Sequence, residues 1–219
     1  MGNEGKIIEK SLDLVIHAKE FIGKIVIPPA EELGLILGDK FRGWRFNNQI
    51  NILIKAQKKL KEKGIDPSKI SIKTLVPLLE NASLEEEISM QEKWVNLLAN
   101  SLNPKYNNQI ILSYINILKQ ITPKEAFILD KIYNMFLENG KYWYISKHEF
   151  FKFVDNISYE DFELIISDLF RLGLLKSHDI HTATTIQEDY SAPNIVMTSS
   201  YDNFEITSLG IKFIKICRN

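Results

Sequence analysis

Apolar residues recur at helical spacing through the first 120 residues of this 219-residue chain, a period typical of packed α-helices rather than strands. We expect a first helix over residues 7–21. A second, long helix is expected from Pro29 to Lys63, because proline suits the first helical turn and Gly64 suits a helix end. The apolar positions of the first helix include Leu12, Val15 and Ile16. This period predicts an N-terminal helical bundle.

Further apolar segments follow over residues 66–79, 83–102 and 107–120. Ser83-Leu84-Glu85-Glu86 has the form of a capping box, so we expect a helix to begin at Ser83. The acids at 85–87 would then lie in its first turn, where the helix dipole favours negative charge. Because consecutive helical residues point to different sides, we do not expect these carboxylates to share a metal ion.

The clearest helix start in the chain is Thr122-Pro123-Lys124-Glu125, which combines an N-cap residue, a proline at the first helical position and a glutamate shortly after it. The order of elements changes beyond this point. We therefore place a domain boundary near residue 120, with an α-helical domain over residues 1–120 and a second domain over residues 121–219.

The second domain is expected to contain three helices followed by a β-hairpin. The helices are expected over residues 125–137, 146–154 and 158–172, and Ser146 and Ser158 each precede an acid by three residues in a capping pattern. Strand-prone stretches lie at 182–187 and 195–198, and a last helix ends at Ile216. The expected fold class is mainly α, a helical bundle followed by a winged-helix-like α+β domain with a small hairpin wing.

A winged helix raises the question of DNA binding, and the charge of the helix in the recognition position argues against it. The segment from Tyr159 to Leu172 carries Glu160, Asp161, Glu163 and Asp168 against one basic residue, Arg171. DNA-reading helices use arginine and lysine to neutralise phosphates and contact bases. We expect no sequence-specific DNA binding and assign this domain to protein contact or dimerisation.

Catalytic motifs are weak throughout the chain. His178 and His181 flank Asp179, but this spacing lacks a second pair of metal ligands and fits solvated turn residues better. The sequence contains neither a glycine-rich phosphate loop nor a Gly-x-Ser-x-Gly motif. We therefore expect no enzyme activity, no catalytic residue, no metal, no cofactor and no small-molecule substrate.

Cysteine usage and hydropathy favour the cytoplasm. Cys217 is the single cysteine, so no internal disulfide can form. The sequence shows neither a secretory signal nor a stretch of about 20 apolar residues that would cross a bilayer. One segment, Ile22 to Gly38, combines a β-branched run with two prolines and leaves peripheral membrane contact as an alternative.

Two stretches resemble the signatures of the Abi-alpha family, a bacterial family associated with abortive infection, which is a defence against phage. The stretches are PAEELGLILGDKFRGWRFNN at residues 29–48 and LENASLEEEISMQEKWVNLLAN at residues 79–100. The resemblance covers residues 20–200 and implies a largely helical domain with a role in phage defence. It carries over no catalytic residue.

The first of these stretches holds the candidate interaction residues. Gly34 and Gly38 lie one helical turn apart and would allow a partner helix to approach closely, flanked by Leu33 and Leu37, with Trp44 as a large anchor. A second group could contact an anion or an acidic partner: Lys40, Arg42 and Arg45.

The leading hypothesis is a non-enzymatic phage-defence protein that acts as a sensor or adaptor through a protein partner or a homo-oligomer. The alternatives are a winged-helix DNA-binding regulator and an effector at the membrane surface.

Overall fold

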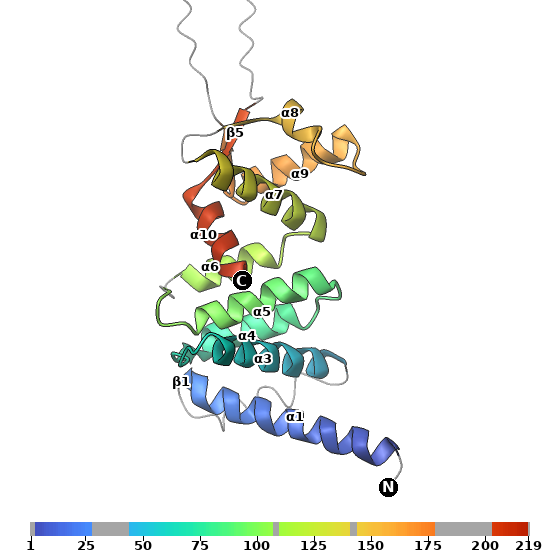
Figure 1. Cartoon of the computed structure of the whole chain (residues 1–219), viewed down its shortest axis with the longest axis vertical. Helices are drawn as coiled ribbons and strands as arrows, with labels where there is room; N and C mark the ends of the chain where they lie inside the picture. Colours follow the sequence, from blue (N-terminus) through green and yellow to red (C-terminus); the bar gives the residue numbers. More distant parts are fainter. Residues whose placement is uncertain (1–2, 28–43, 107–109, 141–143, 178–202, 219) are drawn as a thin grey trace, which may run out of the picture. The chain divides into compact units, whose positions relative to one another are not determined.

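The computed structural model of the chain describes residues 3–27, 44–106, 110–140, 144–177 and 203–218, and these residues are mainly helical (Figure 1). They form nine α-helices and five short strands within the described ranges. None of these helices combines the length and the apolar character needed to cross a bilayer.

The residues group into two compact units, one of residues 1–126 with 213–219 and one of residues 127–212. The chain therefore returns to the first unit at its C-terminus. The division expected near residue 120 stays a prediction.

The first unit is built from helices α1 (Asn3–Ile25), α3 (Trp44–Glu62), α4 (Ile72–Ala82), α5 (Ile88–Ser101) and α6 (Ile111–Leu118), with the last turn of α10 (Ser208–Cys217). α3 packs against α1, α4 and α5. Strands β1 (Val26–Ile27) and β2 (Ile70–Ser71) pair in parallel, and they join the end of α1 to the segment before α4. A helical N-terminal half agrees with the sequence prediction.

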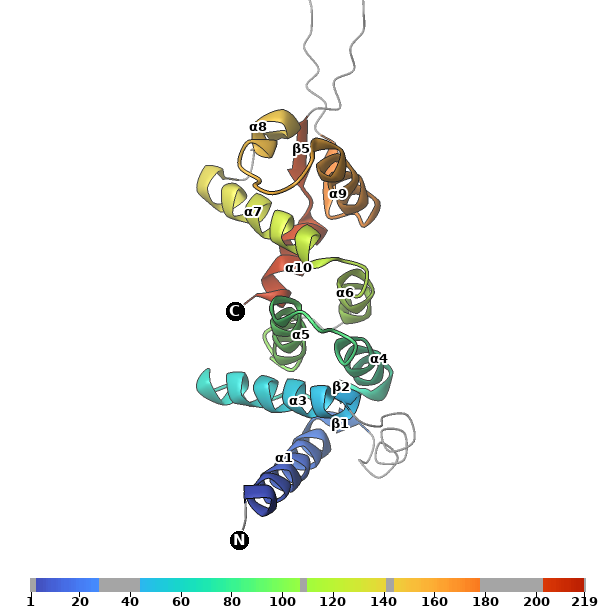
Figure 2. The same ribbon diagram turned by 90° about the vertical axis from the view of Figure 1, so that its right-hand side faces the viewer.

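The buried face of α1 differs from the one marked by the apolar pattern. Leu12 is 60 % exposed and Ile16 is 45 % exposed, whereas Ala18, Phe21, Ile22 and Ile25 are buried. α1 extends through Gly23 to Ile25, and its C-terminal half contacts α3, while its N-terminal end diverges from α3 (Figure 2). Two of the apolar positions that the spacing marked, Leu12 and Ile16, therefore lie outside the buried face of α1.

The expected capping box at Ser83 was also wrong. α4 continues to Ala82, and Ser83 is its buried C-cap, with its hydroxyl donating to the carbonyl of Glu80 at 2.7 Å. α5 begins only at Ile88, and its first turn contains no acidic residue. Instead, the Glu85 carboxylate accepts the backbone N–H of Glu87 at 3.2 Å before the helix starts. The end of α4 therefore uses the serine that the pattern assigned to the start of the next helix.

The second unit contains most of α7 (Pro123–Asn139), then β3 (Ile145–Ser146), α8 (Lys147–Phe151), α9 (Tyr159–Arg171), β4 (Leu175–Ser177), β5 (Asn203–Ile206) and the first turn of α10. The strands form an antiparallel sheet in the order β3-β5-β4. Its register pairs Ile145 with Phe204 and Leu175 with Ile206. The rings of Phe150, Phe162 and Phe204 pack together and are fully buried. The strands expected at 182–187 and 195–198 lie outside the described residues.

The helix starts predicted in this half of the chain are confirmed. At the start of α7, the Glu125 carboxylate accepts the N–H of Thr122 at 2.6 Å, and the Thr122 hydroxyl accepts the N–H of Glu125 at 3.3 Å. Ser146 and Ser158 accept the backbone N–H groups of Glu149 and Asp161. Each cap satisfies a helix N–H that lacks an intrahelical partner.

A close approach of backbone joins the end of α9 to the start of α10. Gly173 has φ +70°, which turns the chain out of α9. The Thr207 hydroxyl donates to the carbonyl of Gly173 at 2.7 Å and accepts the N–H of Gly210 at 2.9 Å. At Gly210 there is no room for a Cβ atom, which would collide with the carbonyl oxygen of Leu174. Glycine is thus required at this position by space and not by its φ angle.

Candidate interaction site

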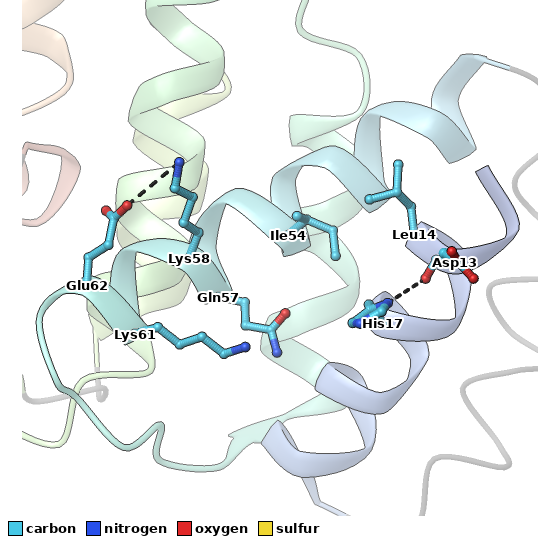
Figure 3. Close-up of a pocket in the computed structure, with 8 residues that line it drawn as sticks. All are labelled: Asp13, Leu14, His17, Ile54, Gln57, Lys58, Lys61 and Glu62. Carbon is cyan, nitrogen blue, oxygen red and sulfur yellow. Dashed lines mark hydrogen bonds and ion pairs between the residues drawn. The ribbon is translucent and has the colours of Figure 1, made fainter. Parts of the chain in front are cut away.

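A groove lies between the middle of α1 and the C-terminal half of α3, with a volume of about 540 Å³ (Figure 3). Leu14 and Ile54 provide its apolar surface. Its polar residues are Asp13 and His17 from α1, and Gln57, Lys58, Lys61 and Glu62 from α3.

The polar groups of this groove, hereafter the α1–α3 groove, are mostly exposed. Nδ1 of His17 lies 2.7 Å from the carbonyl oxygen of Asp13, and because a carbonyl can only accept, this nitrogen is the donor. Lys58 pairs with Glu62 one turn later at 3.7 Å. Exposed pairs of this kind contribute only about 0.3–0.5 kcal/mol, so an incoming charged group can compete for the lysine.

A second groove of about 560 Å³ lies along the same two helices. Leu14 lines both grooves, so one residue of α1 separates them. The remaining lining residues carry no charge: Leu12, Val15, Phe46, Asn47, Ile50 and Asn51. Together the two grooves leave apolar side chains of α1 and α3 accessible, and burying that area would favour association by about 25 cal/mol per Å².

A polar network joins α3 to α5. Lys55 and Lys59 contact Glu92 at 3.2 and 3.3 Å, and Lys59 also donates to Oδ1 of Asn96 at 2.6 Å. Burial alone would raise the pKa of Glu92, but hydrogen bonds and charge from the two lysines outweigh burial and lower the pKa. Glu92 therefore stays ionised and fixes the lysine side chains on this face of α3.

The same face of α5 holds the C-terminal end of α10. Asn96 donates to the carbonyl of Cys217 at 3.2 Å, and Asn100 donates to the carbonyls of Ile216 at 2.8 Å and Arg218 at 3.2 Å. Both asparagines are buried. The last carbonyls of a helix lack intrahelical donors, so these two amides cap α10 from the side. Residues more than 100 positions apart are joined in this way.

Aromatic packing adds to this contact. The rings of Tyr114 on α6 and Phe213 on α10 are 6.1 Å apart. Burial raises the pKa of the Tyr114 phenol, and the nearby Cys217 raises it further. The neutral phenol is therefore the stable form against α10.

Most of the interaction residues proposed from the sequence lie outside the described residues, namely Leu33, Gly34, Leu37, Gly38, Lys40 and Arg42. Trp44 is the first residue of α3, and Arg45 beside it is exposed. His178 and His181 also lie outside the described residues. The candidate interface and the basic cluster therefore stay predictions.

The second sequence signature, residues 79–100, spans the end of α4, the turn and most of α5. Its tryptophan, Trp94, is 1 % exposed and belongs to the core. Its two later asparagines, Asn96 and Asn100, were missed as important residues. The signal that could have found them is two amides four residues apart within the apolar run from Trp94 to Ala99 and its end, because buried amides need hydrogen-bond partners.

Comparison with known proteins gives one family. The model of a family described as abortive infection alpha matches residues 47–217. This range runs from α3 to the end of α10, so it includes the α3–α5–α10 network, while α1 precedes it. No curated protein and no solved structure matches the chain.

Proposed function

The chain belongs to the abortive infection alpha family, and from this membership we propose that it is a phage-defence protein that acts by protein association, as a sensor or an adaptor. The observation that carries the proposal is the family match over residues 47–217, which covers most of the chain. We also propose that it works in the cytoplasm and without catalysis of its own.

The α1–α3 groove supports association. It offers apolar surface from Leu14 and Ile54, bordered by two lysines, two acids, an amide and a histidine. Surfaces of this composition bind protein segments by burying apolar area, while the charged border sets which partner fits. The Nδ1–H group of His17 donates to the carbonyl of Asp13 in its own helix, which orients the ring at the edge of the groove.

We further propose that residues 123–217 form a winged-helix arrangement used for protein contact. In its favour, the described elements follow the order α7, β3, α8, α9, β4, β5, α10, and β5 lies between β3 and β4 in the sheet. In that arrangement α9 occupies the position of a DNA-recognition helix. Its first turn contains Glu160 and Asp161, and its one basic residue, Arg171, pairs with Asp168 at 2.6 Å.

We expect the purified chain to bind duplex DNA no more tightly than about micromolar at physiological salt, the range of non-specific contacts. The acidic α9 would repel phosphates instead of neutralising them. A gel-shift titration against a pool of random duplexes measures this. A retained duplex with nanomolar affinity would favour a DNA-binding regulator instead.

Expressing the gene in a susceptible bacterium should lower phage plating. Infected cultures should also stop growing before phage are released, because abortive infection sacrifices the infected cell. The measurements are plaque counts over a broad phage panel and growth curves after infection at high multiplicity. The controls are an empty vector and the same cells left uninfected, which should grow normally.

Unchanged plating with every phage would contradict the defence role. Lower plating in cultures that survive and keep growing would contradict the abortive mechanism and leave a different form of defence.

A further inference from the structure

The outer face of α9 combines acidic side chains with an exposed leucine. Leu164 is 64 % exposed, and it lies four residues after Glu160 and three after Asp161, both of which are exposed. Residues at these spacings share one face of a helix. The opposite face, with Phe162, Ile166 and Leu169, is buried in the second unit. This α9 face (Glu160, Asp161 and Leu164) therefore presents an apolar side chain beside two negative charges.

The α1–α3 groove offers an apolar surface from Leu14 and Ile54, with Lys58 and Lys61 along its α3 side. Two acids, Asp13 and Glu62, also line the groove, and Glu62 forms an exposed pair with Lys58 that an incoming carboxylate would have to replace. From Trp44 to Glu62, α3 carries five basic residues, Arg45, Lys55, Lys58, Lys59 and Lys61, and a single acid, Glu62. Lys61 points into the groove beside Gln57 (Figure 3).

We propose that copies of this chain associate head to tail, with the α9 face of one copy bound in the α1–α3 groove of the next. This inference rests on the proposed function, because it names the partner in the protein association as a second copy of the chain. Leu164 would enter the apolar part of the groove, while Glu160 and Asp161 face Lys58 and Lys61. Opposite charges around a small apolar contact set both the orientation and the choice of partner.

The distribution of charge favours a second copy of the chain as the occupant of the α1–α3 groove. The chain as a whole is close to neutral, with a formal net charge of −1, yet its charges are unevenly placed. α3 is basic, whereas the exposed start of α9 is acidic. A contact between two different surfaces of identical chains is heterologous, so it continues into a ring or a filament instead of stopping at a dimer. Assembly would thus grow with concentration.

The test compares two charge-reversed chains, Lys58→Glu with Lys61→Glu in one and Glu160→Lys with Asp161→Lys in the other. Light scattering after size exclusion measures mass over a concentration series at low and high salt. The wild type should assemble at low salt and dissociate as salt screens the charges. Each reversed chain alone should assemble at least roughly tenfold more weakly, because two attractions become repulsions.

An equimolar mixture of the two reversed chains should recover assembly. The reversed, acidic groove of the first chain then meets the reversed, basic α9 of the second. The unchanged α9 of the first chain is acidic and meets the unchanged lysines in the groove of the second. Lys105→Glu with Lys119→Glu, which reverses two exposed lysines outside the groove, is the matched control and should assemble as the wild type does. Leu164→Ser should weaken assembly without changing its salt dependence.

A wild type that stays monomeric at every concentration, or a mixture that fails to recover assembly while both chains melt as the wild type does, would overturn the proposal. Plaque counts with the same variants separate it from the proposed function. If the chain is monomeric and still protects against phage, the head-to-tail contact is contradicted and the defence role stands. If the chain assembles and does not protect, the defence role is contradicted and the head-to-tail contact stands.

Discussion

Replacing Gly210 with alanine should destabilise the chain by about 2–3 kcal/mol and lower its melting temperature by roughly 5–10 °C. The new Cβ would collide with the carbonyl oxygen of Leu174 and lie 2.9 Å from Cγ1 of Ile206. The carbonyl of Leu174 cannot move away easily, because it accepts the backbone N–H of Thr207 at 3.0 Å. Thermal melting followed by circular dichroism measures the loss.

The direction of the stability change distinguishes close contact from helix propensity. Alanine favours a helix over glycine by up to about 1 kcal/mol, so without the close contact the substitution in α10 would stabilise the chain. Lys212→Ala, an exposed change two residues later in α10, is the control and should change stability by less than about 0.5 kcal/mol. A Gly210→Ala chain as stable as the wild type would show that the start of α10 does not lie this close to the carbonyl of Leu174.

Replacing both Asn96 and Asn100 with alanine should cost about 3 kcal/mol and release the C-terminal end of α10 from α5. The two amides supply three hydrogen bonds to the carbonyls of Ile216, Cys217 and Arg218. A buried acceptor that loses its donor costs about 1–3 kcal/mol. Chemical denaturation measures the loss, and hydrogen exchange in the last turn of α10 should increase before global unfolding.

The single change Asn100→Asp separates the hydrogen bond from packing. Aspartate has nearly the same shape, but its ionised form cannot donate and places negative charge at the C-terminal end of a helix, where the dipole is unfavourable. Facing carbonyl oxygens would raise the pKa of this carboxyl above its unfolded value. The deficit relative to the wild type should therefore be smallest at low pH, where the protonated acid can donate, and should grow as pH rises through the folded pKa.

Asn51→Ala is the control for these changes, because Asn51 is exposed on α3 and its loss leaves no buried acceptor. Equal stability of the Asn96→Ala, Asn100→Ala chain and this control would contradict the capping role. A deficit of Asn100→Asp that did not depend on pH would point to packing instead of the hydrogen bond.

Helix starts were predicted best where the cap is formed by neighbouring residues. Thr122 with Glu125 and Ser158 with Asp161 make their hydrogen bonds within four residues, so the local sequence suffices. Ser83 shows where this reasoning fails. It matches the same pattern, but the preceding helix α4 ends on it, and α5 begins only at Ile88.

The family resemblance was also readable from the chain, and the match over residues 47–217 confirms it. The roles of two signature residues, Asn96 and Asn100, were not readable, because they serve a helix that lies more than 100 residues later. The amide groups can be seen in the sequence, whereas their partners depend on how α10 packs against α5 in the folded chain.

By itself, the sequence determined the helical character of the chain, the helix caps at Thr122, Ser146 and Ser158, and the family, because these depend on spacing and on contacts within one or two turns. Tertiary structure decided which face of α1 is buried, where Gly210 must remain glycine, and how α3 and α1 leave a groove between them. The physical reason is that burial depends on the partner surface. Leu12 and Ile22 are equally apolar, and only the position of α3 makes one exposed and the other buried.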